Sequence, residues 1–493
     1  SRTFSWGMSL VINPLIACVI SLTLLGLHPS IQADAADRPN ILFVFLDDFG
    51  WRDTGYMGSD FYETPCLDRL AKEGMTFTQA YACAANCAPS RACLLSGQYT
   101  PRHEIYNVGT GPRGQASHRR LQHIPGTKTL REDIPTWAHR LQDAGYKTAA
   151  LGKWHLSQDP IPYGFDLNVG GTHAGSPPKG YYPPHGKAPG LENAPADEFL
   201  TTTLCKRACE FIEKEKASSW FVYLSLFAVH TPIQAKKDLL SKYLSKEPGA
   251  LHQNAKRATM IQAVDDGVSL IMDQIKTLDL DKKTAVVFFS DNGGYGPATD
   301  MHPLKGYKGT YYEGGIRVPF FIKWPGVVQA RSTNQTPIIG VDLYPTFLEM
   351  AGLKPSVDHV LDGVSLVPLL RGGTLAQRSL YWHFPAYLQS YGGSYVMEQQ
   401  DPLFRSRPVG VIREGDWKLM EWFETGELEL YHLKEDVGES TNLSHQFPAM
   451  TRRLHESMQA WRRETNAAIP SVANPSFDAE QEKAAIAAFS KNQ

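Results

Sequence analysis

The sequence predicts an α/β fold with a large mixed, mostly parallel sheet that helices cover on both faces. Four apolar, β-rich runs each end in polar residues, at 40–46, 147–151, 220–226 and 284–289. Their hydrophobicity is continuous rather than alternating, which indicates strands that are covered on both sides. Amphipathic helical patterns at 135–145, which stops at a glycine, and at 258–278 supply the covering helices.

The pattern changes from about residue 371. Short runs separated by turn residues predict a smaller antiparallel sheet, with strands at 380–383, 409–413, 417–420 and 428–431. Apolar residues at helical spacing over 447–461 predict a helix that packs on this sheet, and the tail after residue 474 is expected to form an extra helix or arm.

The N-terminal segment has the pattern of an export signal. Residues 10–27 are largely apolar, and the small-x-small sequence 33–35 follows as a cleavage pattern. We therefore expect export to the periplasm or the medium. The run 15–18 also matches a bacterial lipoprotein box, so lipidation at Cys18 is the alternative. A net charge of -2 and a pI near 6.8 argue against a nucleic-acid partner.

Polar side chains follow the predicted strands at their carboxyl ends, where ligands gather in open α/β sheets. These residues are Asp47, Asp48, Lys153, His155, His230, Asp291 and Asn292. Their carboxylate and amide oxygens favour calcium, or magnesium, over zinc. The alternative for each acidic pair is an ordinary turn or helix cap.

A short helix is expected to start near Cys87. Pro89 suits the first helical position and Gly97 suits the stop. Cys87 then lies at a helix N-terminus, which favours an anion, and Arg91 adds a cation one turn further on. The combination suits a tetrahedral oxyanion. The alternative is a buried core cysteine.

The stretch Cys87-Ala88-Pro89-Ser90-Arg91, followed by Leu95-Ser96-Gly97, resembles the signature of the type I, formylglycine-dependent sulfatases of the alkaline phosphatase superfamily. Residues 145–155 resemble the second sulfatase signature. Similar family matches occur at 228–232 around His230, at 306–319 around Lys308, at 341–346 and at 362–366. The chain is similar to microbial glycan sulfatases and to arylsulfatases.

The resemblance implies a catalytic mechanism. A formylglycine-generating enzyme oxidises Cys87 to Cα-formylglycine, whose hydrate attacks sulfur and forms a covalent sulfate ester. Asp47, Asp48, Asp291, Asn292 and the modified Cys87 hold Ca²⁺ or Mg²⁺. Arg91 and Lys153 lower the pKa of the diol, Lys308 and His230 protonate the leaving group, and His155 accepts the proton that regenerates the aldehyde.

The resemblance further implies a sulfated carbohydrate substrate, of galactose or N-acetylgalactosamine type. Loops 170–178 and 382–385 resemble those of microbial glycan sulfatases, so His173 and His383 are candidates for binding a sugar hydroxyl; otherwise they are ordinary loop residues. Arg405, Arg407 and Arg413 are candidates for further sulfates or a carboxylate. Two rivals remain: a phosphate or phosphonate monoester hydrolase of the same fold, and a catalytically silent protein that binds sulfated glycans.

These patterns divide the chain into a signal peptide (1–35), an N-terminal catalytic domain (36–372) and a smaller C-terminal subdomain (373–493). Cys205 and Cys209 are spaced so that they could form a disulfide across one helical turn. Cys66, Cys83 and Cys93 are core thiols or include one further pair.

Overall fold

The structure of the protein is a computed structural model that describes residues 38–391 and 401–490. The predicted signal peptide and Cys18 lie outside the described residues. Within these ranges, none of the helices combines the length and the apolar character that crossing a bilayer requires.

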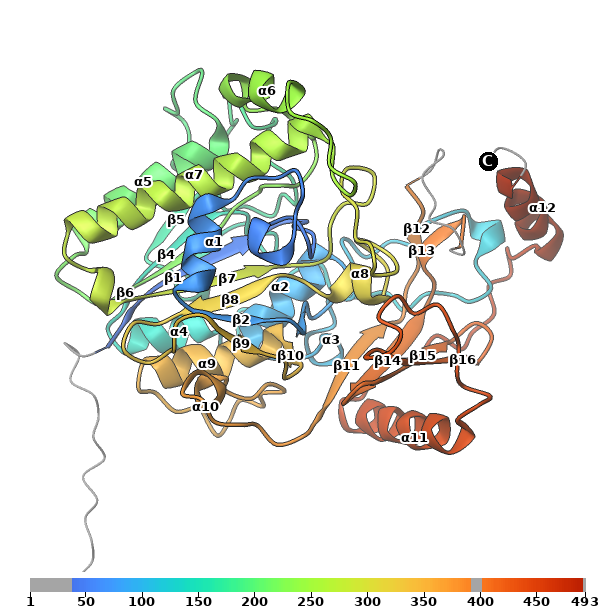
Figure 1. Cartoon of the computed structure of the whole chain (residues 1–493). Helices are drawn as coiled ribbons and strands as arrows, with labels where there is room; N and C mark the ends of the chain where they lie inside the picture. The colour runs from blue at the N-terminus through green and yellow to red at the C-terminus, as the bar shows by residue number, and fades with distance from the viewer. Residues whose placement is uncertain (1–37, 392–400, 491–493) are drawn as a thin grey trace, which may run out of the picture.

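The large sheet has eight strands in the spatial order β5-β4-β6-β1-β7-β8-β2-β9 (Figure 1). The strands β5, β4, β6, β1 and β7 run parallel, whereas β8 is antiparallel to both β7 and β2. The four strands predicted from the sequence are the central neighbours β4, β6, β1 and β7, and the prediction of a mostly parallel sheet is confirmed. The bounds are β1 Asn40–Leu46, β2 Met75–Phe77, β4 Lys147–Gly152, β5 Leu167–Val169, β6 Trp220–Ser225, β7 Thr284–Ser290, β8 Phe320–Lys323 and β9 Ser332–Asn334.

Helices cover both faces of this sheet, because each face of the central strands is apolar. Leu42, Val44 and Leu46 of β1 pack toward one set of helices, whereas the intervening Phe43 and Phe45 pack toward the other. The first set is α1 Pro65–Lys72, α5 Leu200–Lys214, α6 Lys237–Leu244 and α7 Ala255–Thr277. The second set is α2 Cys87–Ser96, α4 Trp137–Asp143, α9 Leu343–Met350 and α10 Val367–Leu370.

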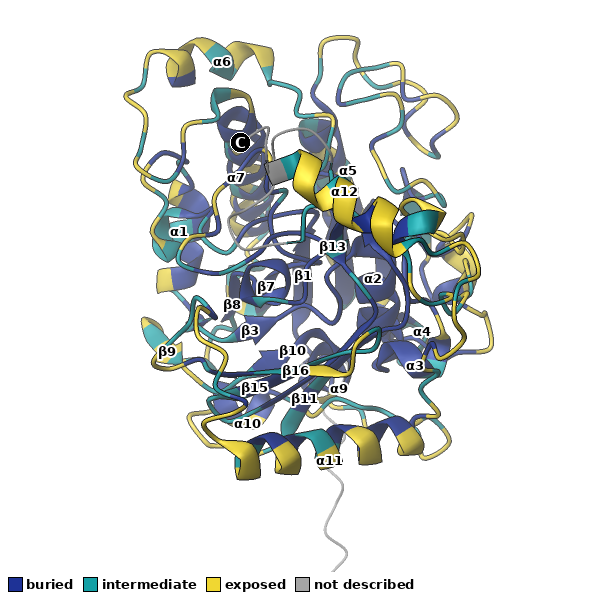
Figure 2. Cartoon of the chain, turned by 90° about the vertical axis from the view of Figure 1, so that its right-hand side faces the viewer, coloured by how far each residue is buried: buried dark blue, intermediate teal, exposed yellow. Residues whose placement is uncertain are grey.

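The C-terminal part forms a separate antiparallel sheet, as predicted, in the order β11-β14-β15-β16. Its strands are β11 Ser379–Phe384, β14 Val409–Glu414, β15 Trp417–Trp422 and β16 Glu427–His432. Helix α11 (Pro448–Glu464) packs Leu454 and Met458 against this sheet, and α12 (Ala479–Ser490) forms the expected extra helix. Both helices expose one side to solvent, whereas the central strands β1 and β7 of the large sheet are buried (Figure 2).

Short elements complete the fold. Strand β3 pairs with β10 in parallel, and β12 pairs with β13 in antiparallel orientation. The bounds are β3 Ala80–Tyr81, β10 Ile338–Ile339, β12 Leu388–Gln389, β13 Phe404–Ser406, α3 Thr100–His103 and α8 Glu313–Ile316.

A buried ion cluster joins the C-terminal sheet to helix α8. The Lys418 ammonium, on β15, lies 3.1 Å from the carboxylate of Glu313 at the start of α8 and 2.7 Å from that of Glu439. All three side chains are fully buried or nearly so. Because breaking a buried ion pair costs about 3–5 kcal/mol, the C-terminal sheet holds α8 and the segment that precedes it, which carries Lys308.

Two details differ from the expectations. Helix α2 begins at Cys87 rather than at Pro89, which is tolerated because amides in the first helical turn need no helical acceptor. Cys205 and Cys209 do not form a disulfide. All six cysteines within the described ranges are free thiols.

Candidate active site

The polar residues that follow the central strands meet at one edge of the sheet. Asp47 and Asp48 follow β1, and Asp291 and Asn292 follow β7. The strand ladder continues into this edge, because the Asp291 N–H donates to the Leu46 carbonyl at 3.0 Å. The four polar side chains are buried, with at most 1 % exposed. Parallel pairing of β1 with β7 therefore brings together acids that are more than two hundred positions apart.

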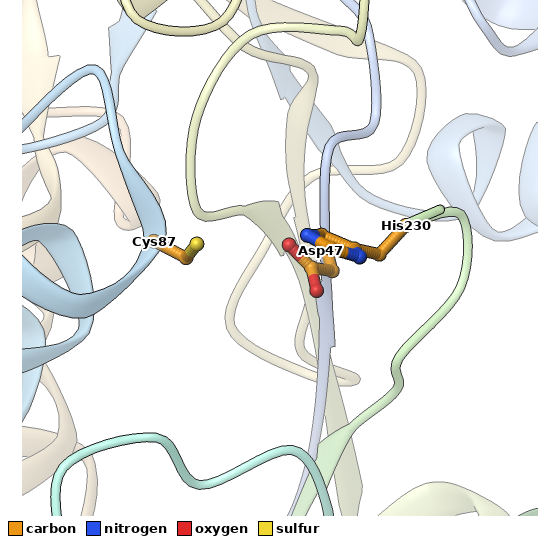
Figure 3. Close-up of side chains that lie close together, drawn as sticks. All are labelled: Asp47, Cys87 and His230. Atoms are coloured by element: carbon orange, nitrogen blue, oxygen red, sulfur yellow. The ribbon is translucent and has the colours of Figure 1, made fainter. Parts of the chain in front are cut away.

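Cys87 faces this edge from the N-terminus of α2 (Figure 3). Its Sγ, a carboxylate oxygen of Asp47 and a ring nitrogen of His230 lie within 4.8 Å of one another. Gly97, with φ 68°, ends the helix in the left-handed conformation that glycine adopts readily. The helix therefore presents the Cys87 side chain, together with its positive N-terminal end, to the acids.

Each acid is paired with one buried cation. The three pairs are Lys153–Asp47 at 2.6 Å, Lys308–Asp48 at 2.7 Å and Arg91–Asp291 at 2.8 Å. Arg91 is fixed further, because its guanidinium also donates to Ser225 Oγ at 2.6 Å and to the Lys153 carbonyl at 3.1 Å. The site thus carries balanced but closely packed charges.

The acids fit a divalent cation. Carboxylate oxygens of Asp47, Asp48 and Asp291 lie within 4.8 Å of one another. In the part of the chain that the structure describes, Asp47 Oδ1 and Asn292 Oδ1 are buried without a hydrogen-bond partner. Burial and the neighbouring acid raise the pKa of both Asp47 and Asp291. Such an all-oxygen set suits Ca²⁺ or Mg²⁺.

The two histidines are neutral at neutral pH. Burial and the nearby Lys153 lower the pKa of His155 far below its usual range, and burial and Lys308 lower that of His230 to about 3. The His230 Nδ1–H donates to the Thr231 carbonyl at 2.8 Å, which leaves Nε2 directed toward Asp48 at 3.9 Å. Each ring therefore offers an unprotonated nitrogen.

Lys308 stays charged. Burial by itself lowers the pKa of its ammonium, but Asp48 outweighs this effect and raises the pKa well above its usual value. Lys308 can therefore act as a fixed cation and a proton donor.

Cys87, His155, His230, Lys308 and Asp48 line one cavity of about 380 Å³. Arg91, Lys153, Asp47, Asp291 and Asn292 lie behind its floor, so the structure brings the predicted catalytic and metal residues together. His173 does not line the cavity but lies beside His155, with 6.2 Å between the ring centres.

The structure corrects the expectation for His383. This side chain is 2 % exposed on β11, and its Nε2–H donates to the Ala468 carbonyl at 2.8 Å. The resemblance of 382–385 to loops of microbial glycan sulfatases suggested a sugar-binding residue, but His383 belongs to the strand that the pattern at 380–383 predicted, and its ring contacts Trp461 of α11. Arg407 and Arg413 are also structural: Arg407 pairs with Asp401 and Glu424, and Arg413 donates to Tyr81 and Gln79. Only Arg405 of the three arginines lines the cavity.

The profile of the sulfatase family matches residues 39–353, which is more than half of the chain. This protein belongs to the sulfatase family. The profile of the N-sulphoglucosamine sulphohydrolase C-terminal region matches residues 307–464. The family and its named members also establish the general activity, so this sulfatase is an enzyme that hydrolyses sulfuric esters.

Two curated relatives support the assignment. A protein named sulfatase from Formosa agariphila is 32% identical over 93% of this chain and 93% of its own length. The N-acetylgalactosamine-6-sulfatase of Mus musculus is 31% identical over 74% of this chain and 72% of its own. Among solved structures, Ps i-CgsB in complex with k-i-k-neocarrahexaose has a TM-score of 0.71 and 27% identity, covering 92% of this chain and 98% of the other.

Sequence reasoning missed one residue behind the site. Arg257, in the first turn of α7, is buried and donates to the Asp48 carbonyl at 2.7 Å and to Asp53 Oδ2 at 2.6 Å. It also donates to the Val229 carbonyl, beside His230, at 3.5 Å. No sequence signal marks it, because its partners lie on other elements.

Proposed function

We propose that this sulfatase hydrolyses a sulfate ester of a sulfated carbohydrate, of galactose or N-acetylgalactosamine type, to the alcohol and inorganic sulfate. The reactive group is Cα-formylglycine, made from Cys87 by a formylglycine-generating enzyme, and the cation is Ca²⁺, with Mg²⁺ as the alternative. One observation carries the proposal: Cys87 Sγ lies at a helix N-terminus, within 4.8 Å of both an acid and a histidine.

Several features support a carbohydrate substrate. The relative from Mus musculus is named an N-acetylgalactosamine-6-sulfatase, and Ps i-CgsB was solved with a neocarrahexaose. The cavity of about 380 Å³ exceeds the size of a sulfate group and leaves room for a sugar ring.

Asp47, Asp48, Asp291 and Asn292 would hold the cation. The bound cation would attract the sulfate oxygens and offset their charge, and the hydrated aldehyde would supply one oxygen to attack sulfur and a second to release the sulfate. Arg91, fixed by Asp291 and Ser225, provides a positive charge behind position 87.

The remaining side chains move protons. Lys308, which stays charged, donates a proton to the departing alcohol oxygen, and His230 contacts the same oxygen. A bound sulfate ester raises the pKa of His230, because a negative charge favours the protonated ring. His155 is neutral and accepts the proton from the second oxygen at position 87 as the aldehyde re-forms.

We also propose export, on the apolar run and cleavage pattern of residues 10–35. N-terminal sequencing of protein recovered from the periplasm or medium tests it. A chain that stays in the cytoplasm with its N-terminus intact would contradict export.

Mass spectrometry of active enzyme tests the central claim. Trypsin releases residues 73–91, which contain Cys83 and Cys87, so fragment ions must locate the change. An aldehyde at position 87 supports the mechanism, and an unmodified thiol in fully active protein overturns it.

Paired assays with 4-nitrophenyl sulfate and 4-nitrophenyl phosphate separate the rivals. Preference for phosphate indicates the phosphate or phosphonate hydrolase. Glycan binding without sulfate release, in protein that carries the aldehyde, indicates a silent binding protein.

A further inference from the structure

Two arginines that pair with none of the described carboxylates line the cavity. Arg113 and Arg405 border the same space as Cys87 and Lys308. Among the side chains that the structure describes, no carboxylate forms an ion pair with either guanidinium, in contrast to Arg91, Lys153 and Lys308, which are each neutralised by one acid. Counted over the described residues, the mouth of the cavity therefore carries an excess of two positive charges.

Backbone contacts hold both arginines in place. Arg113 Nη2 donates to the Val108 carbonyl at 2.7 Å, and Arg405 Nε donates to the Gln389 carbonyl at 2.9 Å. The Arg405 guanidinium also lies 3.8 Å from the centre of the Tyr391 ring. The other guanidinium N–H groups of Arg113 and Arg405 donate to none of the described residues.

Arg405 is close to the reacting end of the site. A Cβ atom placed on Gly309 would lie 3.1 Å from Arg405 Nη1, so the guanidinium packs on the backbone next to Lys308. The two arginines are also near each other: both line this cavity, and a Cβ atom placed on Gly114, next to Arg113, would lie 2.5 Å from Cε1 of Phe404, next to Arg405. Burial and the charge of Arg405 lower the pKa of Arg113. Two guanidinium groups brought together in a partly buried wall are stabilised when an anion binds between them.

We propose that Arg113 and Arg405 bind a second anionic group of the substrate, a sulfate or a carboxylate, while the sulfate to be cleaved lies beside Cys87. The enzyme then selects carbohydrates that carry at least two anionic groups. This inference rests on the proposed function and narrows its substrate class. Arg113 and Arg405 determine specificity and take no part in the chemical step.

The test compares substrates that differ only in the second anion. N-acetylgalactosamine 6-sulfate is paired with the 4,6-disulfate, and the methyl ester of chondroitin 6-sulfate disaccharide is paired with the free acid. The first pair tests a sulfate and the second a carboxylate. A charge-assisted hydrogen bond is worth roughly 10- to 100-fold in affinity, so we expect kcat/KM to be at least about tenfold higher for the doubly charged member of one pair.

The variants Arg113→Gln and Arg405→Gln, singly and together, are expected to remove this preference, whereas Arg405→Lys keeps part of it because the charge remains. Arg131→Gln, at an arginine whose side chain is 58% exposed, is the matched control and keeps the wild-type ratio. The measured quantity is the ratio of kcat/KM between the two substrates of a pair. A variant that loses activity on both substrates equally leaves this ratio unchanged.

Equal kcat/KM within both pairs for the wild-type enzyme overturns the inference, and this comparison needs no variant. A preference that survives in the double variant overturns it as well. A different result would contradict the proposed function itself: enzyme that carries the aldehyde would release no sulfate from these substrates or from 4-nitrophenyl sulfate.

Discussion

Arg257 is expected to hold two loops of the active site, and Arg257→Met tests this role. The side chains of Arg257 and Asp53 are both fully buried and lie 2.6 Å apart. Methionine fills a similar volume but removes the guanidinium partner of the buried Asp53 carboxylate, and the loss of such a partner costs about 3–5 kcal/mol of unfolding free energy. Asp53 keeps the Gly50 N–H at 2.8 Å and the Thr299 hydroxyl at 2.6 Å as donors, and the His252 ring nitrogen lies 3.8 Å from its carboxylate.

The double variant Arg257→Met/Asp53→Asn separates stability from activity. Removing the unpaired charge should restore about 1–3 kcal/mol relative to the sum of the single variants. It should not restore kcat, because the carbonyls of Asp48 and Val229 still lack their donor. A shift of Asp48 or His230 by about 1 Å lowers the rate by roughly 100-fold.

Urea unfolding followed by tryptophan fluorescence gives the free energies, and 4-nitrophenyl sulfate hydrolysis gives kcat. The stability deficit should also depend on pH. Burial raises the pKa of Asp53, and Arg257 normally holds it below its usual range. Without Arg257 we expect the folded-state pKa of Asp53 to rise above the unfolded value. The stability deficit should then grow as pH rises from the lowered pKa of the wild type to the raised pKa of the variant, and stay constant at higher pH.

The control is Arg207→Met, at a surface pair with Glu210 whose side chains are 35% and 62% exposed. We expect it to lose less than about 1 kcal/mol. An Arg257→Met variant within about 1 kcal/mol of wild type, or a double variant with wild-type kcat, refutes the role assigned to Arg257.

Three further predictions concern the site itself. Cys87→Ala should abolish turnover while the melting temperature and calcium binding stay close to wild type; substantial residual activity would refute the role of position 87. Asp291→Ala should lower activity in a way that added calcium restores only in part, and unchanged kinetics would exclude Asp291 from the cation site. Gly175→Ala should lower kcat roughly tenfold, because the new Cβ lies 2.5 Å from His155 Cε1; Gly111→Ala, with open space around it, is the control, and equal rates for the two variants would contradict the placement of His155.

The central strands and the helices on either face could be predicted, because their signals are local. A strand buried on both sides is a continuous apolar run, as in β1 and β7. The short strands β2, β8 and β9 were not predicted, since a three- or four-residue strand gives no reliable periodicity. Their place in the sheet depends on neighbours that are distant in sequence.

The sequence by itself determined the chemical class of the site. The residue types around Cys87 and at the strand ends, in their order along the chain, indicated an anion-binding centre with oxygen ligands for a cation. This was possible because parallel strands place their carboxyl ends at one edge, so residues that follow successive strands converge without further information.

Only the tertiary structure decided which other polar residues share the site. His383 and Arg413 looked equivalent to Arg405 in the sequence, yet only Arg405 borders the cavity. Arg113 and Arg257, which sequence reasoning did not single out, lie at its mouth and behind its acids. The reason is physical. The roles of His383, Arg413 and Arg257 depend on partners that are distant in the sequence, and those of Arg405 and Arg113 depend on having no carboxylate partner among the described residues. Only packing brings such groups together or keeps them apart.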